Sequence, residues 1–191
     1  MTRARPWLPA LLPALLVALV AIAILFAMGR PPICTCGTVS LWVSSAASPE
    51  TSQMIADWYT ASHIIHGFLF FAALWLVARR VPIGIRLAIA VFVEAAWEIA
   101  ENSPWIIDRY RSATAAVGYS GDSILNSTSD IAVMVVGFLL ARRLPLWASV
   151  LIVIVLELVP LFVIRDNLTL NVIMLLSPSD AIREWQAATL Q

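Results

Sequence analysis

Five apolar segments constrain the fold of this chain more than any other feature of its sequence. They cover residues 7–28, 63–78, 83–101, 122–141 and 146–164. A helix needs about 20 predominantly apolar residues to cross the hydrocarbon core of a membrane. Because hydrophobic residues make up 61% of the chain and charged residues only 13%, little sequence is left for a soluble domain. We therefore expect one all-α integral-membrane domain over residues 1–191, a bundle of about five transmembrane helices.

The first apolar segment, Trp7 to Met28, could anchor the chain or be removed as a signal peptide. Its apolar run is longer than the roughly 7 to 15 residues of a signal-peptide core, and no A-x-A cleavage site follows it. We interpret it as an uncleaved first membrane helix.

The arginines, which are the only basic residues of the chain, are distributed unevenly between the two ends of the expected bundle. One end carries no acid and holds Arg3, Arg5, Arg79, Arg80, Arg86, Arg142 and Arg143. Cytoplasmic loops of membrane proteins are enriched in Lys and Arg, whereas acids contribute little to orientation. We therefore expect a multi-pass protein of a bacterial plasma (inner) membrane, with its N-terminus in the cytoplasm and its C-terminal tail in the periplasm.

The tail is too interrupted to form a sixth span. Leu168 to Leu176 is apolar but short, so it is expected to lie at the membrane interface or to re-enter. The run Ser177-Pro178-Ser179-Asp180 has the form of a capping box with proline at the first helical position. A short interfacial helix is predicted to follow, with Ile182 and Trp185 on its membrane-facing side.

Polar side chains concentrate between residues 94 and 130, a stretch that holds six of the twelve acidic residues. The i, i+4, i+7 spacing of one helical face occurs there twice, in Glu94, Glu98 and Glu101 and again in Asp122, Asn126 and Ser129. An ionisable group at membrane depth is costly unless it is paired or hydrated, which makes it a candidate for function. Our candidate catalytic residues are Glu98, Glu101, Asp122 and Asn126.

Structural roles are the alternative for part of this set. Asp122 could do no more than cap the next helix, because Gly-Asp-Ser before an apolar run is a helix start signal. Asn126 and the neighbouring serines could serve only to pack membrane helices together.

His63 and His66 begin the second apolar segment, one helical turn apart and at the same end of the bundle as the acidic residues. With carboxylates nearby, they offer nitrogen and oxygen ligands that suit zinc, iron or manganese. Hydrogen bonds to carboxylates would satisfy the same histidines without a metal. We list both as candidate metal ligands, with a divalent metal as cofactor. One of them is expected within hydrogen-bond or shared-ligand reach of Glu98, Glu101 or Asp122.

Arg109 and Arg111 lie in the connection between the two acidic segments. Arginine forks bind phosphate and carboxylate, so both are candidate substrate-binding residues for a lipid headgroup or a lipid-linked phosphate. Ion pairing with nearby acids is the alternative. Cys34 and Cys36 lie in the long first loop, on the side where thiols oxidise, and a redox role, metal binding and cross-linking remain open for them.

Four runs of sequence carry a resemblance to a known family: CTCG, SHIIHGF, WEIAENSPWIIDRYR and YSGDSILNSTSD. They resemble an uncharacterised family of bacterial polytopic inner-membrane proteins with placeholder names, and the resemblance covers essentially the whole chain. It implies a plasma-membrane protein and no particular activity.

Over residues 94–141 the chain also resembles VanZ-like membrane proteins, the group that contains a teicoplanin-resistance factor. Their pattern places Glu and then Gln on one helix, an arginine in the loop, and Asp with Asn four residues later at the start of the next helix. The residues that match are Glu98, Arg109, Asp122 and Asn126. Glu101 stands where glutamine is expected, Ser129 replaces a glycine, and the histidine pair has no counterpart.

Three classes of function fit these observations. The first is a membrane-embedded enzyme that acts from the periplasmic side on a lipid or lipid-linked substrate by acid–base or metal-assisted chemistry. The second is a non-catalytic envelope protein of VanZ-like type that binds a headgroup. The third, ion or proton translocation, is least favoured because the cytoplasmic half offers no matching polar path. Membrane lipids are the expected partners, and the zero net charge gives no reason to expect nucleic acid.

Overall fold

The structure, a computed structural model, describes residues 8–116 and 118–188. Over these residues the chain forms eight α-helices and no strand, which confirms the predicted all-α class. The helices are α1 (Leu8–Ala27), α2 (Thr60–Ala78), α3 (Ile83–Glu101), α4 (Pro104–Ala113), α5 (Ile124–Arg143), α6 (Leu146–Ile164), α7 (Leu168–Leu176) and α8 (Asp180–Ala187). The expectations for Arg3, Arg5 and Trp7 concern residues outside the described part of the chain.

Three helices, α2, α5 and α6, are long and apolar enough to cross a membrane, and α1 contributes the shorter apolar stretch Leu11–Ala27. Helix α3 has the length but carries Arg86 and three glutamates. Two of them, Glu94 and Glu98, are completely buried, so the ionisable face of α3 is turned into the bundle. The membrane character of the protein is thereby supported, whereas the count of five spans and their orientation stay predictions.

Two predicted segments coincide with helices residue for residue, namely 83–101 with α3 and 146–164 with α6. Pro82 and Pro145 occupy the position before each helix, where the absent N–H of proline removes no helical hydrogen bond. Helix α2 begins three residues before the predicted segment.

Helix α5 begins two residues later than predicted. Ser123 is its N-cap, because the Ser123 side chain accepts a hydrogen bond from the Asn126 backbone N–H at 3.1 Å. The interpretation of Asp122 as the cap was therefore wrong, and its carboxylate is not used in capping.

Helix α4 was not expected, since the connection from 102 to 121 was interpreted as a loop. Ser103 caps α4 by accepting from the Ile106 backbone N–H at 3.4 Å, and Pro104 occupies the first helical position. Both signals are present in the sequence. Arg109 and Arg111 therefore project from a helix and not from a flexible loop.

The tail forms two short helices. Helix α7 coincides with the apolar segment 168–176, and α8 follows as the predicted final helix. The capping box predicted at Ser177 was wrong, because Ser177 ends α7 and Ser179 is the N-cap of α8. On α8, Ile182 is half-buried and Trp185 is exposed.

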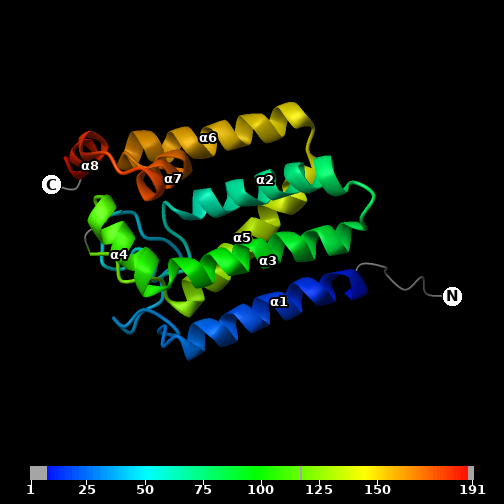
Figure 1. The fold of residues 1–191 in the computed structure, drawn as a ribbon, viewed down its shortest axis with the longest axis horizontal. Coiled ribbons are helices and arrows are strands. Elements are labelled where there is room, and N and C mark those ends of the chain that lie inside the picture. The colour runs from blue at the N-terminus through cyan, green and yellow to red at the C-terminus, as the bar shows by residue number, and fades with distance from the viewer. Residues whose placement is uncertain (1–7, 117, 189–191) are drawn as a thin grey trace.

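The five long helices run side by side along the long axis of the molecule, as Figure 1 shows. Helix α1 packs against α3, and α2 packs against α5. Their apolar core consists of Ala14, Ala21, Leu87, Ala90, Val91, Ala95, Ile131, Met134 and Phe138. The short turns α2–α3 and α5–α6 lie at the end where α1 begins, whereas α4, α7 and α8 gather at the opposite end (Figure 1).

The first loop, residues 28–59, is attached to the beginning of α5. The backbone N–H of Ile124 donates to the Pro31 carbonyl at 2.8 Å. The Arg30 guanidinium donates to the backbone carbonyls of Asp122 and Ser120 at 2.8 and 2.9 Å. Cys34 and Cys36 form a disulfide within this loop, one of the states that the sequence left open.

Helices α2 and α5 approach each other closely at Gly67 and Gly137. A Cβ atom added at Gly137 would overlap the backbone carbonyl of Ile64, which cannot rotate away as a side chain could. We therefore expect Gly137→Ala to lower the free energy of unfolding by about 1–3 kcal/mol. Thermal unfolding in detergent measures this change. Gly118→Ala, where a Cβ would meet nothing within 4 Å, is the control, and equal Tm values for both variants would contradict the close contact.

Candidate functional site

A cavity of about 470 Å³ opens at the end of the bundle that holds α4, α7 and α8. Its walls come from the first loop, from the beginning of α2 and α5, and from α4 and α7. The ionisable and hydrogen-bonding side chains that line it include Asp57, Tyr59, His63, His66, Glu101, Tyr110, Tyr119, Asp122, Asn126, Asp130, Asp166 and Asn171. Five of the eight sequence-derived candidates line this cavity, namely His63, His66, Glu101, Asp122 and Asn126.

His63, which lines the cavity, faces carboxylates from two other helices. Its Nδ1 lies 2.6 Å from Glu94 Oε1 and 3.5 Å from Glu98 Oε1 on α3. Its Nε2 lies 3.9 Å from Asp130 Oδ2 on α5. The expected approach of a histidine to Glu98 is present at 3.5 Å. We refer to His63, His66, Glu94, Glu98, Glu101 and Asp130 together as the carboxylate–histidine cluster.

Glu94 is the best satisfied carboxylate of the cluster. It lies within hydrogen-bonding distance of His63 Nδ1, and its second oxygen is 3.0 Å from His66 Nδ1. The ring of His66 also stacks on Phe70, with 5.6 Å between the centroids. Glu94 was part of the predicted stripe but was not among the catalytic candidates, and its partners make it the residue that orients both histidines.

Glu98 and Asp130 are in the opposite situation. Both side chains are buried, with Glu98 completely inaccessible. Within the described part of the chain, neither oxygen of Glu98 has a hydrogen-bond partner, and the same is true of Asp130 Oδ1. A buried carboxylate without a donor or a counter-cation is costly, so these oxygens are available for a ligand.

Asp122 is held by a set of hydrogen bonds next to the cluster. Its Oδ2 accepts from Asn102 Nδ2 at 2.8 Å, and its Oδ1 accepts from the Tyr119 hydroxyl at 2.9 Å. Its backbone N–H donates to Asn102 Oδ1 at 2.7 Å. Asn102 therefore fixes the Asp122 carboxylate in place at the cavity wall.

Asn126 and the two arginines make structural contacts. Asn126 Nδ2 donates to the Met54 carbonyl at 3.0 Å and so holds the first loop. Arg109 Nε donates to the Leu175 carbonyl at 2.9 Å, and Arg111 Nε donates to the Tyr119 carbonyl at 2.6 Å. Neither arginine is among the described residues that line the cavity, so their role in substrate binding stays a prediction.

Tyrosine hydroxyls supply hydrogen-bond donors around the cavity. The Tyr59 hydroxyl donates to Asp166 at 3.1 Å, and the Tyr110 hydroxyl donates to Asn171 at 2.7 Å. Burial, followed by nearby carboxylates, raises the pKa of Tyr59, Tyr110 and Tyr119 well above the ordinary value, so these hydroxyls stay protonated. No periodic pattern marks these tyrosines in the sequence.

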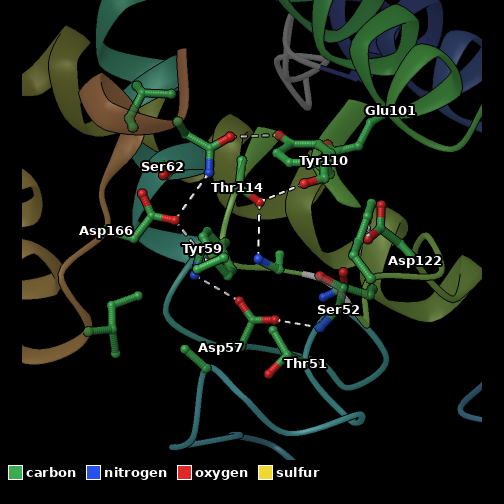
Figure 2. A pocket seen from close by; sticks show the side chains of 18 of the residues that line it. Thr51, Ser52, Asp57, Tyr59, Ser62, Glu101, Tyr110, Thr114, Asp122 and Asp166 are labelled. Carbon is green, nitrogen blue, oxygen red and sulfur yellow. Dashed lines mark hydrogen bonds between the residues drawn. The ribbon is translucent and has the colours of Figure 1, made fainter. Parts of the chain in front are cut away.

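Asp57 shapes one wall of the cavity. Its carboxylate accepts from the backbone N–H groups of Ser52 at 2.7 Å and of Tyr59 at 2.8 Å. Figure 2 shows hydrogen bonds that link Asp57 to Tyr59 and Tyr59 to Asp166 along this wall. Glu101 and Asp122 are drawn on the other side of the cavity. The wall is therefore fixed by hydrogen bonds before any ligand enters.

Asp166 should make stability depend on pH. Burial raises its pKa from 3.8 to about 6, although the Asn167 N–H and the Tyr59 hydroxyl oppose the shift. Because the folded state holds this proton more tightly than the unfolded state, the stability it contributes is full below about pH 4 and is lost as the pH rises through about 6. We expect the Tm to fall across this window, and to fall less steeply in Asp166→Asn.

The control for that measurement is Asp180→Asn, which changes a largely exposed carboxylate on α8. It should retain the wild-type pH dependence in a series of thermal unfolding curves. Equal slopes for wild type and Asp166→Asn would contradict the raised pKa.

Comparisons with known proteins show which family this chain belongs to. The family described as "Protein of unknown function (DUF2585)" matches residues 25–188. A UPF0314 protein of Paracoccus denitrificans is 60% identical over 174 residues, which cover 91% of this chain and 90% of the relative. A UPF0314 protein of Sphingopyxis alaskensis is 58% identical over 182 residues, 95% of this chain and 94% of the relative.

No solved structure matches the chain. The resemblance to a family with placeholder names is confirmed by these relatives. The resemblance to VanZ-like proteins stays a prediction, because the matching family and the relatives named above carry other descriptions.

Proposed function

The chain belongs to the DUF2585 family of proteins of unknown function, and from that premise we propose that it is a multi-pass enzyme of the bacterial inner membrane. In this proposal the cavity receives the polar head of a lipid or lipid-linked substrate, and the carboxylate–histidine cluster acts on it. The observation that carries the proposal is a cavity of about 470 Å³ with buried ionisable groups, at one end of an apolar bundle.

The exposed surface of the helices supports the membrane location. Val150, Leu151, Ile154 and Val155 of α6 each leave about half of their surface uncovered, between 47% and 53%. Only Pro160 and Ile164 of this helix are buried. Helix α6 is apolar on nearly all sides, with Glu157 as its one charged residue, and such a helix is stable when lipid covers it.

The arginines support the orientation. Arg79 and Arg80 follow α2, and Arg142 and Arg143 end α5, at the end of the bundle away from the cavity (Figure 1). Because arginines favour the cytoplasmic side, the cavity faces the periplasm in this proposal. The N-terminus is then cytoplasmic and the tail with α7 and α8 is periplasmic.

An apolar groove beside the cavity favours an amphiphilic substrate. Its volume is about 310 Å³, and it lies between α2 and α6, lined by residues that include Ile64, Val155 and Val159. Asp57 and the beginning of α2 border both the groove and the cavity. Trp58 lines the groove and packs edge-on against Trp42, and tryptophans are frequent where membrane helices meet the headgroup region. An acyl chain in the groove would place its headgroup in the cavity.

The arrangement of His63 favours catalysis over passive binding. With its Nδ1 held by Glu94 at 2.6 Å, the ring has a fixed orientation, and its Nε2 is available as a proton acceptor or as a metal ligand. Ion translocation is less well supported, because the core next to the cluster is apolar and includes Val91, Met134 and Phe138.

Lipid analysis of a deletion strain tests the function. We expect one lipid or lipid-linked species to accumulate and to return to its normal level with the wild-type gene or with Asp108→Asn, which changes an exposed carboxylate. His63→Asn, produced at the same level in the membrane, should fail to restore it. Restoration by His63→Asn would favour the non-catalytic alternative, and an unchanged lipid profile would reject a lipid substrate.

Reporter fusions test the topology independently. Fusions after residue 60, within 102–121 and at the C-terminus should all report a periplasmic location. A cytoplasmic C-terminus would overturn the count of five spans.

A further inference from the structure

The carboxylate–histidine cluster contains more negative charge than its neighbours can balance. It holds four carboxylates, and the chain has no lysine. Among the described residues, the ion pairs that involve these carboxylates are with His63 and His66. Even if both histidines were protonated, two negative charges would remain in a buried site. Such a site requires additional cations, whether protons or a metal ion.

The uncompensated oxygens lie around the ring of His63. Glu98 is completely buried with both oxygens unpartnered, and its Oε1 lies 3.5 Å from His63 Nδ1. Asp130 is 4% exposed with Oδ1 unpartnered, while its Oδ2 lies 3.9 Å from His63 Nε2. In a folded protein, buried polar atoms without partners are rare and point to an absent ligand.

The distances between His63 and the neighbouring carboxylates distinguish a hydrogen bond from the binding of one ion by two ligand atoms. Ligand atoms about 2.1 Å from one ion lie roughly 3–4 Å from each other. The 2.6 Å between His63 Nδ1 and Glu94 is too short for that and is a hydrogen bond. The 3.9 Å between His63 Nε2 and Asp130 Oδ2 is too long for a hydrogen bond. One ligand atom each from His63, Glu98 and Glu101 also lies within 4.8 Å of the others.

We propose that His63, Glu98 and Glu101 hold a divalent transition-metal ion, with Asp130 as a nearby negative charge and Glu94 as the residue that orients His63. One nitrogen and two carboxylate oxygens, with positions left open for water or substrate, suit zinc, manganese or iron. Glu101 and Asp130 line the cavity, so an ion there would face the substrate and could polarise a phosphoryl or carbonyl oxygen. This metal centre does not depend on the identity of the substrate.

A second arrangement competes with the first. Ligand atoms of His63, His66 and Glu94 also lie within 4.8 Å of each other. In that group, however, both Nδ1 atoms already lie within hydrogen-bonding distance of Glu94, at 2.6 and 3.0 Å. Substitutions of Glu98 and of His66 therefore distinguish the two arrangements.

The metal content of the full-length protein, purified in detergent without chelators, tests the proposal. We expect wild type to retain about one zinc, manganese or iron ion per chain, and Glu98→Gln and Glu101→Gln to lower the affinity for added metal at least about tenfold. Asp108→Asn should bind as wild type does. His66→Asn should retain the ion, because His66 is not a ligand in the proposed centre.

Thermal unfolding of the metal-free protein separates metal loss from misfolding. Adding Zn²⁺ or Mn²⁺ should raise the Tm of wild type by roughly 5 °C or more and leave Glu98→Gln unchanged. Metal-free Glu98→Gln should unfold at or above the wild-type temperature, because the amide removes a buried charge. Wild type without bound metal and without a Tm shift overturns the centre, as does loss of the ion in His66→Asn alone. A bound ion with no lipid phenotype would reject only the proposed function.

Discussion

Replacing His63 by alanine should lower the free energy of unfolding by about 3–5 kcal/mol, the usual cost of leaving a buried charge without its partner. His63 is the positively chargeable group nearest to carboxylates on two helices, at 2.6 Å from Glu94, 3.5 Å from Glu98 and 3.9 Å from Asp130. Without the imidazole these carboxylates face each other in a site that water hardly reaches. Unfolding curves in detergent and the amount of protein in the membrane fraction measure the loss.

A double-mutant cycle identifies the cause of that loss. His63→Ala combined with Glu94→Gln should recover about 0.5–3 kcal/mol relative to the sum of the single changes, because the amide removes one of the unpaired charges. His66→Ala, which removes a half-buried ring with contacts to Glu94 and Phe70, should cost less than His63→Ala. Strictly additive losses would show that packing, and not charge, explains the effect.

Replacing Asn102 by alanine is the second change from which we expect a large effect, about 3 kcal/mol. Asn102 is 3% exposed, and its amide group bonds to Asp122 through both ends, at 2.8 and 2.7 Å. It also donates to the Glu98 carbonyl at 2.9 Å. Alanine would leave the Asp122 N–H and one carboxylate oxygen buried without a partner.

Two measurements check the Asn102 prediction. The Tm of Asn102→Ala should fall well below that of Ser112→Ala, which removes an exposed hydroxyl with one bond at 3.1 Å. Binding of any cavity ligand should weaken together with stability, because Asp122 lines the cavity. An Asn102→Ala variant that unfolds like Ser112→Ala would mean that Asp122 finds other partners.

The sequence predicted the long helices well because their ends carry local signals. Helices α3 and α6 begin directly after Pro82 and Pro145, and each continues for 19 predominantly apolar residues. These properties depend on neighbours in sequence. The start of α5 was misassigned for the same local reason, because Gly-Asp-Ser offers two adjacent caps and only the structure shows that Ser123 is used.

The site was less accessible to prediction because it depends on contacts between helices. Spacing placed Glu94 and Glu98 on one face of α3, but it gave no indication that Glu94 would be bonded to both histidines while Glu98 remained unpartnered. The interpretation of residues 102–121 as a loop overlooked the Ser103-Pro104 start signal of α4, the helix that carries Arg109 and Arg111.

The attachment of the first loop to α5 has a consequence for how the protein is made. Arg30 forms hydrogen bonds with Ser120 and Asp122, which follow it by 90 and 92 positions in the chain. The Asn126 side chain forms a hydrogen bond with Met54, which precedes it by 72 positions. At about 5–20 residues per second, a ribosome needs several seconds or more to add that length. During this interval the loop has been synthesised but lacks its partners at the beginning of α5. A chaperone or a disulfide-forming enzyme could reach Cys34 and Cys36 in this time, before α5 is made and the loop attaches to it.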